Sequence, residues 1–205
     1  MCGFRVGPQN NRLITQLINR TVNGTRLPQV SVMIEFELRD CDVTLNCQQT
    51  FNTHIYETSS ENAVAARNIG NYRQVQRVSP DVTTRAIVNE TVVVNFNTNH
   101  SSFYFAIEDE TTCIIITRLI AFYHVCPRQT INLLTHVPET IAPAIGSSPI
   151  AVYGHCIKNA LTEDGSAPRL ICSPGGMWTL LGSGCRCAPG DVYYTVSGEC
   201  TSLCK

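Results

Sequence analysis

Eleven of the 205 residues are cysteines, a residue type that forms disulfides, holds zinc or carries redox chemistry. A structural zinc site needs tight ligand pairs such as C-x2-C repeated at a fixed distance, and this chain offers a single C-x-C, Cys185 and Cys187. The spacing therefore favours a disulfide framework in an oxidising compartment. Seven of the cysteines lie in the last part of the chain: Cys126, Cys156, Cys172, Cys185, Cys187, Cys200 and Cys204.

Other residues that could do chemistry form no recognisable constellation. No metalloprotease motif or nucleophile elbow surrounds the histidines, so we interpret them as surface or strand residues and expect no catalytic site, no metal and no cofactor. Glu108-Asp109-Glu110 lacks the spaced oxygen ligands of a calcium loop, which favours a solvated turn before a strand. Gly175-Gly176 is interpreted as a turn. The histidines are His54, His100, His124, His136 and His155.

Arg39 differs because it ends a predicted strand and is followed by Asp40 and Cys41, whose nearest partner in sequence is Cys47. A bridge between these cysteines would close a tight hairpin and fix the direction of Arg39. A guanidinium at such a place suits bidentate capture of a carboxylate. The alternative is an internal ion pair with Asp40, Glu37 or another residue of the sheet.

The elements that must position Arg39 are β-strands. Apolar and other residues alternate from Pro28 to Leu38, the period of a strand with one buried face. Apolar residues occupy both faces of Ile114–Tyr123, so we expect that strand to be central, and Glu61–Arg67 is the one helical segment. Short strands separated by polar turns predict an antiparallel sandwich or jelly roll. The further strand segments are Phe51–Tyr56, Thr91–Phe96, Phe103–Ile107 and Cys113–Val125.

Composition and charge exclude several classes of partner. The formal net charge is −1 and charged residues make up 15%, so no basic field exists for nucleic acid or an anionic membrane surface. No stretch reaches the roughly 20 apolar residues of a membrane helix, and Cys2–Ile18 lacks the apolar core of a signal peptide. We expect an oxidised protein to have further sequence before Met1. Four sequons fit secretion: Asn19, Asn23, Asn89 and Asn99.

The composition changes at Cys126-Pro127 to Pro, Gly and Cys. The next four cysteines, with Trp178 between the third and fourth, are similar to a sushi module, and the tail after Cys187 is similar to the opening of an EGF-like repeat. Such small modules bury too little surface alone and need cross-links. We expect three domains, at residues 1–125, 126–186 and 187–205.

Around Arg39 the residues resemble the extracellular region of Eph receptors. The segment Val32–Glu57 carries LRDC, TFN and Tyr-Glu in the order of that family, and Phe103–Asp109 with the following Cys113 is similar to its FYLAFQD strand. The likeness continues in register through Cys126-Pro127 and Trp178…Cys185-Arg186-Cys187 and covers essentially the whole chain.

The resemblance implies an all-β fold, an antiparallel jelly-roll β-sandwich followed by small disulfide-rich sushi and EGF-like modules. Family members have further strands before the position of Cys2, so we expect an incomplete jelly roll. The resemblance also implies five bridges and leaves Cys204 to a partner beyond Lys205. The bridges are Cys2–Cys113, Cys41–Cys47, Cys126–Cys172, Cys156–Cys185 and Cys187–Cys200.

In this family a loop of the ephrin enters a channel on the jelly roll, and the arginine of LRDC, here Arg39, meets an ephrin carboxylate. The resemblance implies that the Cys2–Cys113 bridge lies near the channel floor and that Tyr72–Asp81 is the channel loop. The remaining ligand-binding residues expected are Ile114, Ile115, Ile116, Val78, Pro80 and Asp81.

These likenesses predict the ectodomain of an Eph-like cell-surface receptor that binds an ephrin-like protein for cell–cell signalling. Receptor clustering would use the sushi and cysteine-rich modules. A membrane helix and a tyrosine kinase would belong to the parent protein. The alternatives are a secreted adhesion or matrix protein built from the same modules, and a carbohydrate-binding or hydrolytic jelly roll, because one architecture hosts many functions.

Overall fold

The computed structural model describes residues 11–38, 50–80, 86–109 and 114–202. Inter-residue contacts divide the chain into two compact units, Met1–Phe122 (unit 1) and Tyr123–Lys205 (unit 2). This division falls slightly before the boundary expected at Cys126, and unit 2 contains both of the predicted small modules.

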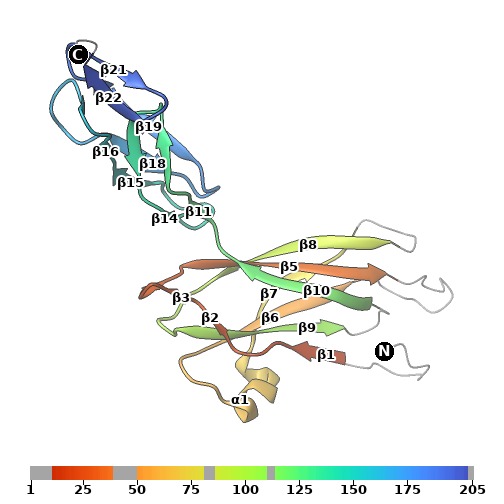
Figure 1. Ribbon diagram of the computed structural model, residues 1–205. Helices are drawn as coiled ribbons and strands as arrows, with labels where there is room; N and C mark the ends of the chain where they lie inside the picture. Colours follow the sequence, from red (N-terminus) through yellow and green to blue (C-terminus); the bar gives the residue numbers. More distant parts are fainter. Residues whose placement is uncertain (1–10, 39–49, 81–85, 110–113, 203–205) are drawn as a thin grey trace. The chain divides into compact units, whose positions relative to one another are not determined.

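Unit 1 is a two-layer β-sandwich of antiparallel strands (Figure 1). One sheet has the order β10-β5-β8, and the other has the order β1-β9-β6-β7 with β2 also paired to β9. The all-β, jelly-roll-like class predicted from the sequence is thereby confirmed. The elements are β1 (Asn11–Ile14), β2 (Ile18–Asn19), β3 (Thr21–Val22), β4 (Thr25–Arg26), β5 (Gln29–Leu38), β6 (Phe51–Thr58), α1 (Ala63–Arg67), η2 (Ile69–Asn71), β7 (Arg73–Val78), β8 (Ile87–Asn95), β9 (Ser102–Asp109) and β10 (Ile114–Phe122).

The core lies between the two sheets and follows the predicted alternation. On β5 the residues Val30, Val32, Ile34 and Phe36 are all buried, with the last three fully excluded from solvent. Inward-facing side chains of β6 and β9 pack against these residues. The Phe36 and Phe51 rings form an edge-to-face pair with centroids 5.0 Å apart. Burial of one face of β5 thus joins the two layers.

The predicted central position of the Ile114–Tyr123 strand is wrong within the described residues. β10 pairs with β5 alone, while β5 occupies the middle of its sheet with β8 on the other side. No side chain of β10 is fully buried. Apolar residues on both faces therefore reflect an apolar sheet edge and not burial on both sides.

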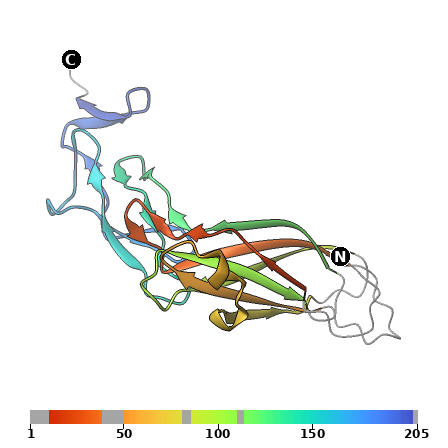
Figure 2. The ribbon, with the colours of Figure 1, turned by 90° about the horizontal axis from the view of Figure 1, so that it is seen from below.

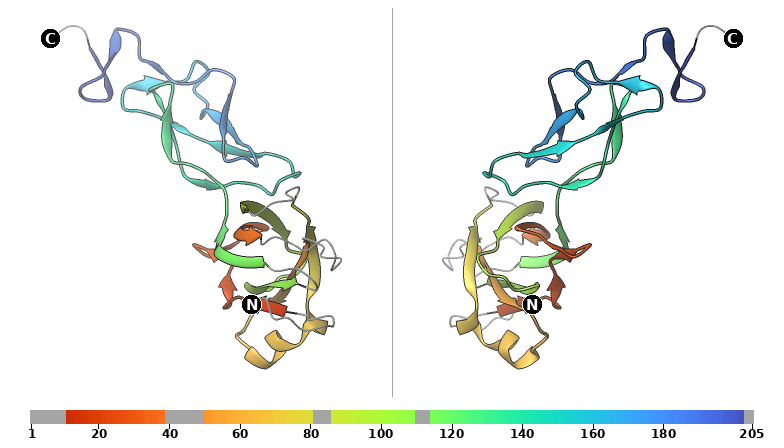
Figure 3. Two further views of the ribbon diagram at one scale, coloured as in Figure 1. Left: turned by 90° about the vertical axis from the view of Figure 1, so that its right-hand side faces the viewer. Right: turned by 90° about the vertical axis from the view of Figure 1, so that its left-hand side faces the viewer.

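The predicted helix is confirmed as α1, a single short helix capped by the Asn62 side chain, which accepts a hydrogen bond from the Ala65 backbone N–H at 2.9 Å. Figures 1 and 3 show α1 on the outer side of the β1-β9-β6-β7 sheet. The Tyr72 hydroxyl donates to the Ala66 carbonyl at 2.8 Å, and Ala66 is buried. These contacts attach the helix to the tyrosine-rich outer face of that sheet.

A buried arginine organises one end of unit 1. Arg20 is 3% exposed, and its guanidinium donates to the carbonyls of His100 (2.6 Å), Leu27 (3.3 Å) and Thr98 (2.5 Å). The same group lies 4.3 Å from the centre of the Phe96 ring. Arg20 thereby ties the β3–β4 hairpin to the turn before β9, and we call this region the Arg20 end.

Unit 2 consists of short antiparallel strands in small sheets. The three-stranded sheets have the orders β12-β13-β16 and β15-β18-β19, and the remaining strands pair two by two. The strands are β11 (Val125–Cys126), β12 (Gln129–Ile131), β13 (Thr135–Val137), β14 (Thr140–Ile141), β15 (Ile150–Tyr153), β16 (His155–Cys156), β17 (Ala160–Leu161), β18 (Arg169–Cys172), β19 (Trp178–Leu181), β20 (Arg186–Cys187), β21 (Asp191–Tyr194) and β22 (Glu199–Ser202).

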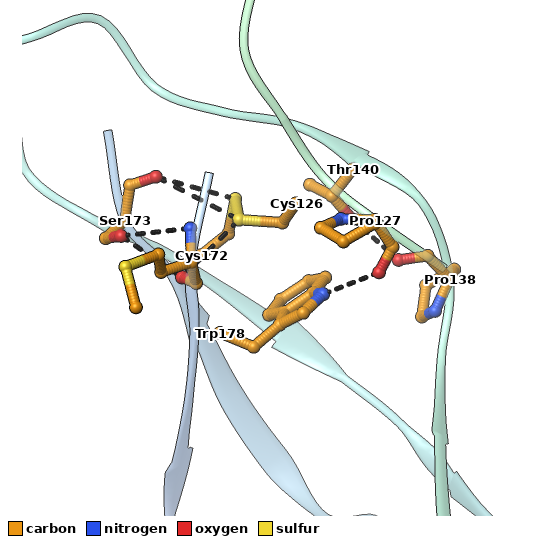
Figure 4. The surroundings of a disulfide bond; sticks show 8 residues. Cys126, Pro127, Pro138, Thr140, Cys172, Ser173 and Trp178 are labelled. Carbon is orange, nitrogen blue, oxygen red and sulfur yellow. Dashed lines mark hydrogen bonds between the residues drawn. A yellow bond between two sulfur atoms is a disulfide. The ribbon is translucent and has the colours of Figure 1, made fainter. Parts of the chain in front are cut away.

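Within the part of unit 2 that the structure describes, three disulfides join the same cysteines as the family resemblance implied: Cys126–Cys172, Cys156–Cys185 and Cys187–Cys200. Figure 4 shows the first of them beside Trp178, whose indole N–H donates to the Pro127 carbonyl at 2.8 Å. Gly176 has a φ of +76° and closes the turn before β19, which confirms the turn predicted at Gly175-Gly176.

The two small modules predicted in unit 2 share part of their packing. Cys185 and Cys200 belong to one buried cluster with Ile157 and Ala160, and the Asn159 side chain donates to the Cys200 carbonyl at 2.8 Å. This cluster includes residues on both sides of the boundary expected at residues 186/187. Among the described residues, no helix is long and apolar enough to cross a membrane.

Candidate ligand-binding site

Segments far apart in the sequence meet at the end of unit 1 where β5 finishes. Leu38 pairs with Ile114, the first residue of β10, and Phe51 at the start of β6 pairs with Val78 at the end of β7. Figures 1 and 2 show these strand ends together, beside the end of β9 and the start of β8. We call this region the Leu38 end. Leu38 is the residue that precedes Arg39 in the sequence.

The three isoleucines predicted in the site lie at the exposed edge of this end. Ile114 and Ile116 share a face with Phe36, the partner of Ile116 on β5, and Ile115 lies on the opposite face. All three are partly exposed. Because Phe36 and Phe51 are buried directly behind, the edge continues the apolar interior outward to where a ligand can reach it.

A β-bulge follows these isoleucines. The register shifts between Ile116 and Arg118, and the hydroxyl of Thr117 donates to the carbonyl (3.1 Å) and the carboxylate (2.8 Å) of Glu35. A bulge increases local twist and redirects side chains, and such irregularities are common beside binding sites. The bulge separates Ile114–Ile116 from the remainder of β10.

The predicted channel loop Tyr72–Asp81 is in large part a strand, and this expectation is wrong for Arg73–Val78, which form β7 and pair with β6. Val78 is 2% exposed, so its side chain belongs to the core and not to an open surface. Pro80 is partly exposed just after the strand. Strand pairing prevailed because Val78 is buried opposite Phe51, and the segment continues antiparallel to β6 past a register shift at Val75.

A charged cluster that the sequence did not reveal lies near the same end. Arg12 on β1 is 2.5 Å from Glu108 on β9, and the imidazole of His54 on β6 is 3.1 Å from the other carboxylate oxygen. Glu108 and Asp109 are buried within β9, so the solvated turn predicted there is wrong for these two residues. Pairing with Arg12 offsets the cost of burying the Glu108 charge.

No local signal could have exposed this cluster, because 96 residues separate Arg12 from Glu108 in sequence. Only the antiparallel register of β1 with β9 places them opposite each other. Arg12 and Glu108 thus place opposite charges side by side on this sheet.

A second charged group lies on the same sheet away from the Leu38 end. Burial by itself would raise the pKa of Glu57, but hydrogen bonds from the Thr98 hydroxyl and the Asn97 backbone, with Arg73 and Arg20 nearby, lower it. The Arg73 guanidinium is 3.5 Å from this carboxylate. Burial also raises the pKa of Tyr72 to about 12. The contacts of the Glu57 carboxylate with Arg73 and Thr98 stabilise this sheet.

Several predicted site residues lie outside the described residues: Arg39, Cys2, Cys113 and Asp81. So do the expected bridges Cys2–Cys113 and Cys41–Cys47 and the cysteine expected to pair beyond Lys205, Cys204. The described remainder is an apolar sheet edge flanked by the ends of four other strands. Such a surface can bind a protein loop by burial of apolar groups. Within the described chain, no group of three or more His, Cys, Asp or Glu side chains is arranged to hold a metal ion.

Comparison with known families agrees with this geometry. The profile of the ephrin receptor ligand binding domain matches residues 1–126, and that of the ephrin cysteine rich domain matches residues 128–187. The division between these two matches falls close to the division between the two compact units.

Individual relatives extend the similarity over nearly the whole chain. Ephrin type-B receptor 3 of Xenopus laevis is 31% identical over 202 residues, covering 93% of this chain and 20% of the relative. Ephrin type-A receptor 4-B of Xenopus laevis is 29% identical over 217 residues (100% and 21%), and human ephrin type-A receptor 6 is 27% identical over 212 residues (98% and 20%). The chain thus spans about a fifth of the length of these relatives. Because the profile of the ephrin receptor ligand binding domain matches more than half of this chain, the chain belongs to the ephrin receptor family.

Proposed function

We propose that this chain is the extracellular ligand-binding region of an ephrin receptor and that it binds a loop of an ephrin-like protein at the Leu38 end of unit 1. The observation that carries the proposal is the register of the strands there. Leu38 pairs with Ile114 and Phe51 pairs with Val78. These pairs bring the residues next to Arg39, the three isoleucines and the Pro80 segment to one end of the sandwich.

Binding at this end divides into two physical contributions. Partly exposed Ile114 and Ile116 offer apolar surface that continues from the Phe36–Phe51 pair, and burial of such surface supplies most of the affinity of a protein interface. Arg39 would pair with a ligand carboxylate, which orients the ligand and excludes partners that lack the acid.

The positions of the sequons also fit a ligand site at the Leu38 end. Asn19, Asn23 and Asn99 are exposed and lie at the Arg20 end, where β2 pairs with the start of β9 and Asn23 occupies the β3–β4 turn. Glycans there would be at the opposite end of unit 1 from the Leu38 end. Asn89 is exposed on β8, opposite Glu35. The three positions at the Arg20 end can therefore carry glycans while the Leu38 end stays accessible.

The test is a biosensor measurement of the purified chain against a panel of immobilised ephrins, with substitutions at each contribution. Arg39→Glu should abolish binding, and Arg39→Ala should cost about 2–5 kcal/mol if the ion pair is desolvated. Ile116→Ser should weaken binding to every ephrin in the panel, since it removes apolar surface without changing charge. Arg26→Glu makes the same charge change as Arg39→Glu on an exposed residue of the Arg20 end and should leave the affinity unchanged.

Two results would contradict the proposal. Equal affinities of the wild type, Arg39→Glu and Ile116→Ser would remove the Leu38 end from the interface. Failure of the wild type to bind any ephrin, with circular dichroism showing a folded β protein, would refute the proposed ligand class.

The remainder of the receptor is proposed from the family alone. Because the relatives are about five times longer than this chain, we infer that the full protein continues into a single membrane helix and a tyrosine kinase. Unit 2, which carries the cysteine-rich match, would mediate receptor clustering at the cell surface. Catalysis would then belong to the kinase and not to this region.

A further inference from the structure

Two histidines of unit 2 lie side by side on neighbouring strands, although the sequence places them 19 residues apart (155 − 136). His136 on β13 is the register partner of His155 on β16. Directly opposite residues of an antiparallel pair project from the same face of the sheet. The centroids of the two imidazole rings are 5.4 Å apart, with an angle of 56° between the ring planes.

This separation fits shared coordination of one metal ion. Imidazole nitrogen lies about 2.0–2.1 Å from zinc, so two imidazoles on a tetrahedral ion have ring centroids about 5 Å apart. Both side chains are exposed, so a hydrated ion can reach them. Imidazole ligands suit zinc, copper and nickel.

One of the two rings already has the outer hydrogen bond that metal ligands usually have. The Thr130 hydroxyl on β12 lies 2.7 Å from Nδ1 of His136, and Thr130 is the register partner of His136. Such a bond fixes the ring and leaves Nε2 for the ion. Thr130, His136 and His155 thus form a row across β12, β13 and β16.

The strands that carry the pair are held in place independently of any ion. Cys156, next to His155, is bridged to Cys185, so it is not itself available as a thiolate ligand. A Cβ on Gly154 would come within 2.7 Å of the His136 carbonyl, so glycine is needed for β16 to approach β13 this closely. A rigid pair loses little conformational freedom on binding, which favours chelation.

The pair opens into a groove of about 620 Å³ whose lining also includes Arg128, Gln129 and Glu139. Glu139 supplies a negative charge that offsets Arg128 for a bound cation. Since the described residues contain no group of three candidate ligands, water would occupy the remaining coordination positions.

We propose that His136 and His155 form a binding site for one divalent transition-metal ion on unit 2. This site goes beyond the ligand-binding function proposed for unit 1 and is independent of it. The assigned ligand atoms are an imidazole nitrogen of each histidine, with Thr130 as a positioning residue for His136.

The test is titration of the full chain with Zn²⁺ by calorimetry, repeated with Cu²⁺ and electron paramagnetic resonance. We expect one saturable Zn²⁺ per chain and a Cu²⁺ spectrum with coupling to two nitrogens. His136→Ala and His155→Ala should each lower the affinity at least tenfold and remove one nitrogen coupling. Thr130→Val should weaken binding about tenfold, within the range for outer partners of metal ligands.

His100→Ala is the matched control, because His100 is an exposed histidine of unit 1 whose Nδ1 is also 3.0 Å from a hydroxyl, that of Ser59. The Zn²⁺ affinity of the His100→Ala variant should equal that of the wild type. Absence of saturable Zn²⁺ binding in the wild type, or retention of full affinity in the His136→Ala/His155→Ala double variant, would overturn the proposal. All four positions are exposed, and circular dichroism verifies that each variant folds.

Discussion

The contacts of Arg20 allow the most quantitative prediction. Arg20→Met keeps much of the aliphatic stem but removes a guanidinium that is 3% exposed and donates to three backbone carbonyls. A net hydrogen bond to a charged group contributes about 1.5–3 kcal/mol, so three give about 4.5 kcal/mol at the lower bound. Burial of the guanidinium, which lowers its pKa, subtracts from this value. We expect unit 1 to lose about 3–5 kcal/mol, because three carbonyls lose a donor and each unsatisfied buried group costs about 1–3 kcal/mol.

The assay uses the single tryptophan of the chain, Trp178, to separate the two units. In urea unfolding, Trp178 fluorescence follows unit 2, whereas far-ultraviolet circular dichroism follows the strands of both units. A loss of 3–5 kcal/mol with a urea dependence of about 1–3 kcal/mol per molar should lower the midpoint of unit 1 by at least about 1 M and leave the Trp178 transition unchanged.

Arg20→Lys and Arg26→Met test the mechanism. Lysine keeps the charge but cannot serve three carbonyls in a fork, so it should cost about 2 kcal/mol. Arg26 is exposed on the same hairpin, and its loss should stay within about 0.5 kcal/mol. If Arg20→Met shifted the midpoint no more than Arg26→Met, the three hydrogen bonds would not be the source of stability. An equal shift of the Trp178 transition would show that the effect is not confined to unit 1.

Two further predictions concern cross-links and ionisation. The disulfides Cys126–Cys172, Cys156–Cys185 and Cys187–Cys200 close loops of 46, 29 and 13 residues. In the loop-entropy treatment, replacing both cysteines of a bridge by serine should therefore cost about 4, 3.6 and 3 kcal/mol of unfolding free energy, respectively. Unfolding followed by Trp178 fluorescence measures the order of these costs, and a different order would contradict the entropic account. Because burial raises the pKa of Tyr72 from 10.0 to about 12, the stability from its protonated form should be complete below pH 10 and lost as the pH rises toward 12. The tyrosinate absorbance of Tyr72→Phe, subtracted from that of the wild type, should therefore show a group titrating near 12, and a difference titrating near 10 would refute this.

Much of the fold could be predicted where a pattern is local. The alternation on β5 directly reports which face is buried, and the composition of Glu61–Arg67 predicts α1. Expectations failed where burial depends on distant strands. The apolar β10 forms a sheet edge, Arg73–Val78 pair with β6 and do not form a loop, and the acidic Glu108 is buried because Arg12 lies opposite.

The candidate sites divide in the same way. The motif around Arg39 and the cysteine order identify the family because they are linear patterns that survive divergence. No linear pattern joins His136 to His155, and the sequence alone favours interpreting each as an isolated surface residue. Their meeting depends on the register of β13 with β16 and on the space left by Gly154.

The sequence by itself determined the class of fold and the family, since side-chain period and cysteine spacing are properties of the chain before it folds. The tertiary structure alone decided which apolar strand lies at an edge, which charges neutralise one another and which histidines become neighbours. The physical reason is that these features depend on strand pairings across tens of residues, whose partners are selected by the combined burial of whole sheets and not by any local segment.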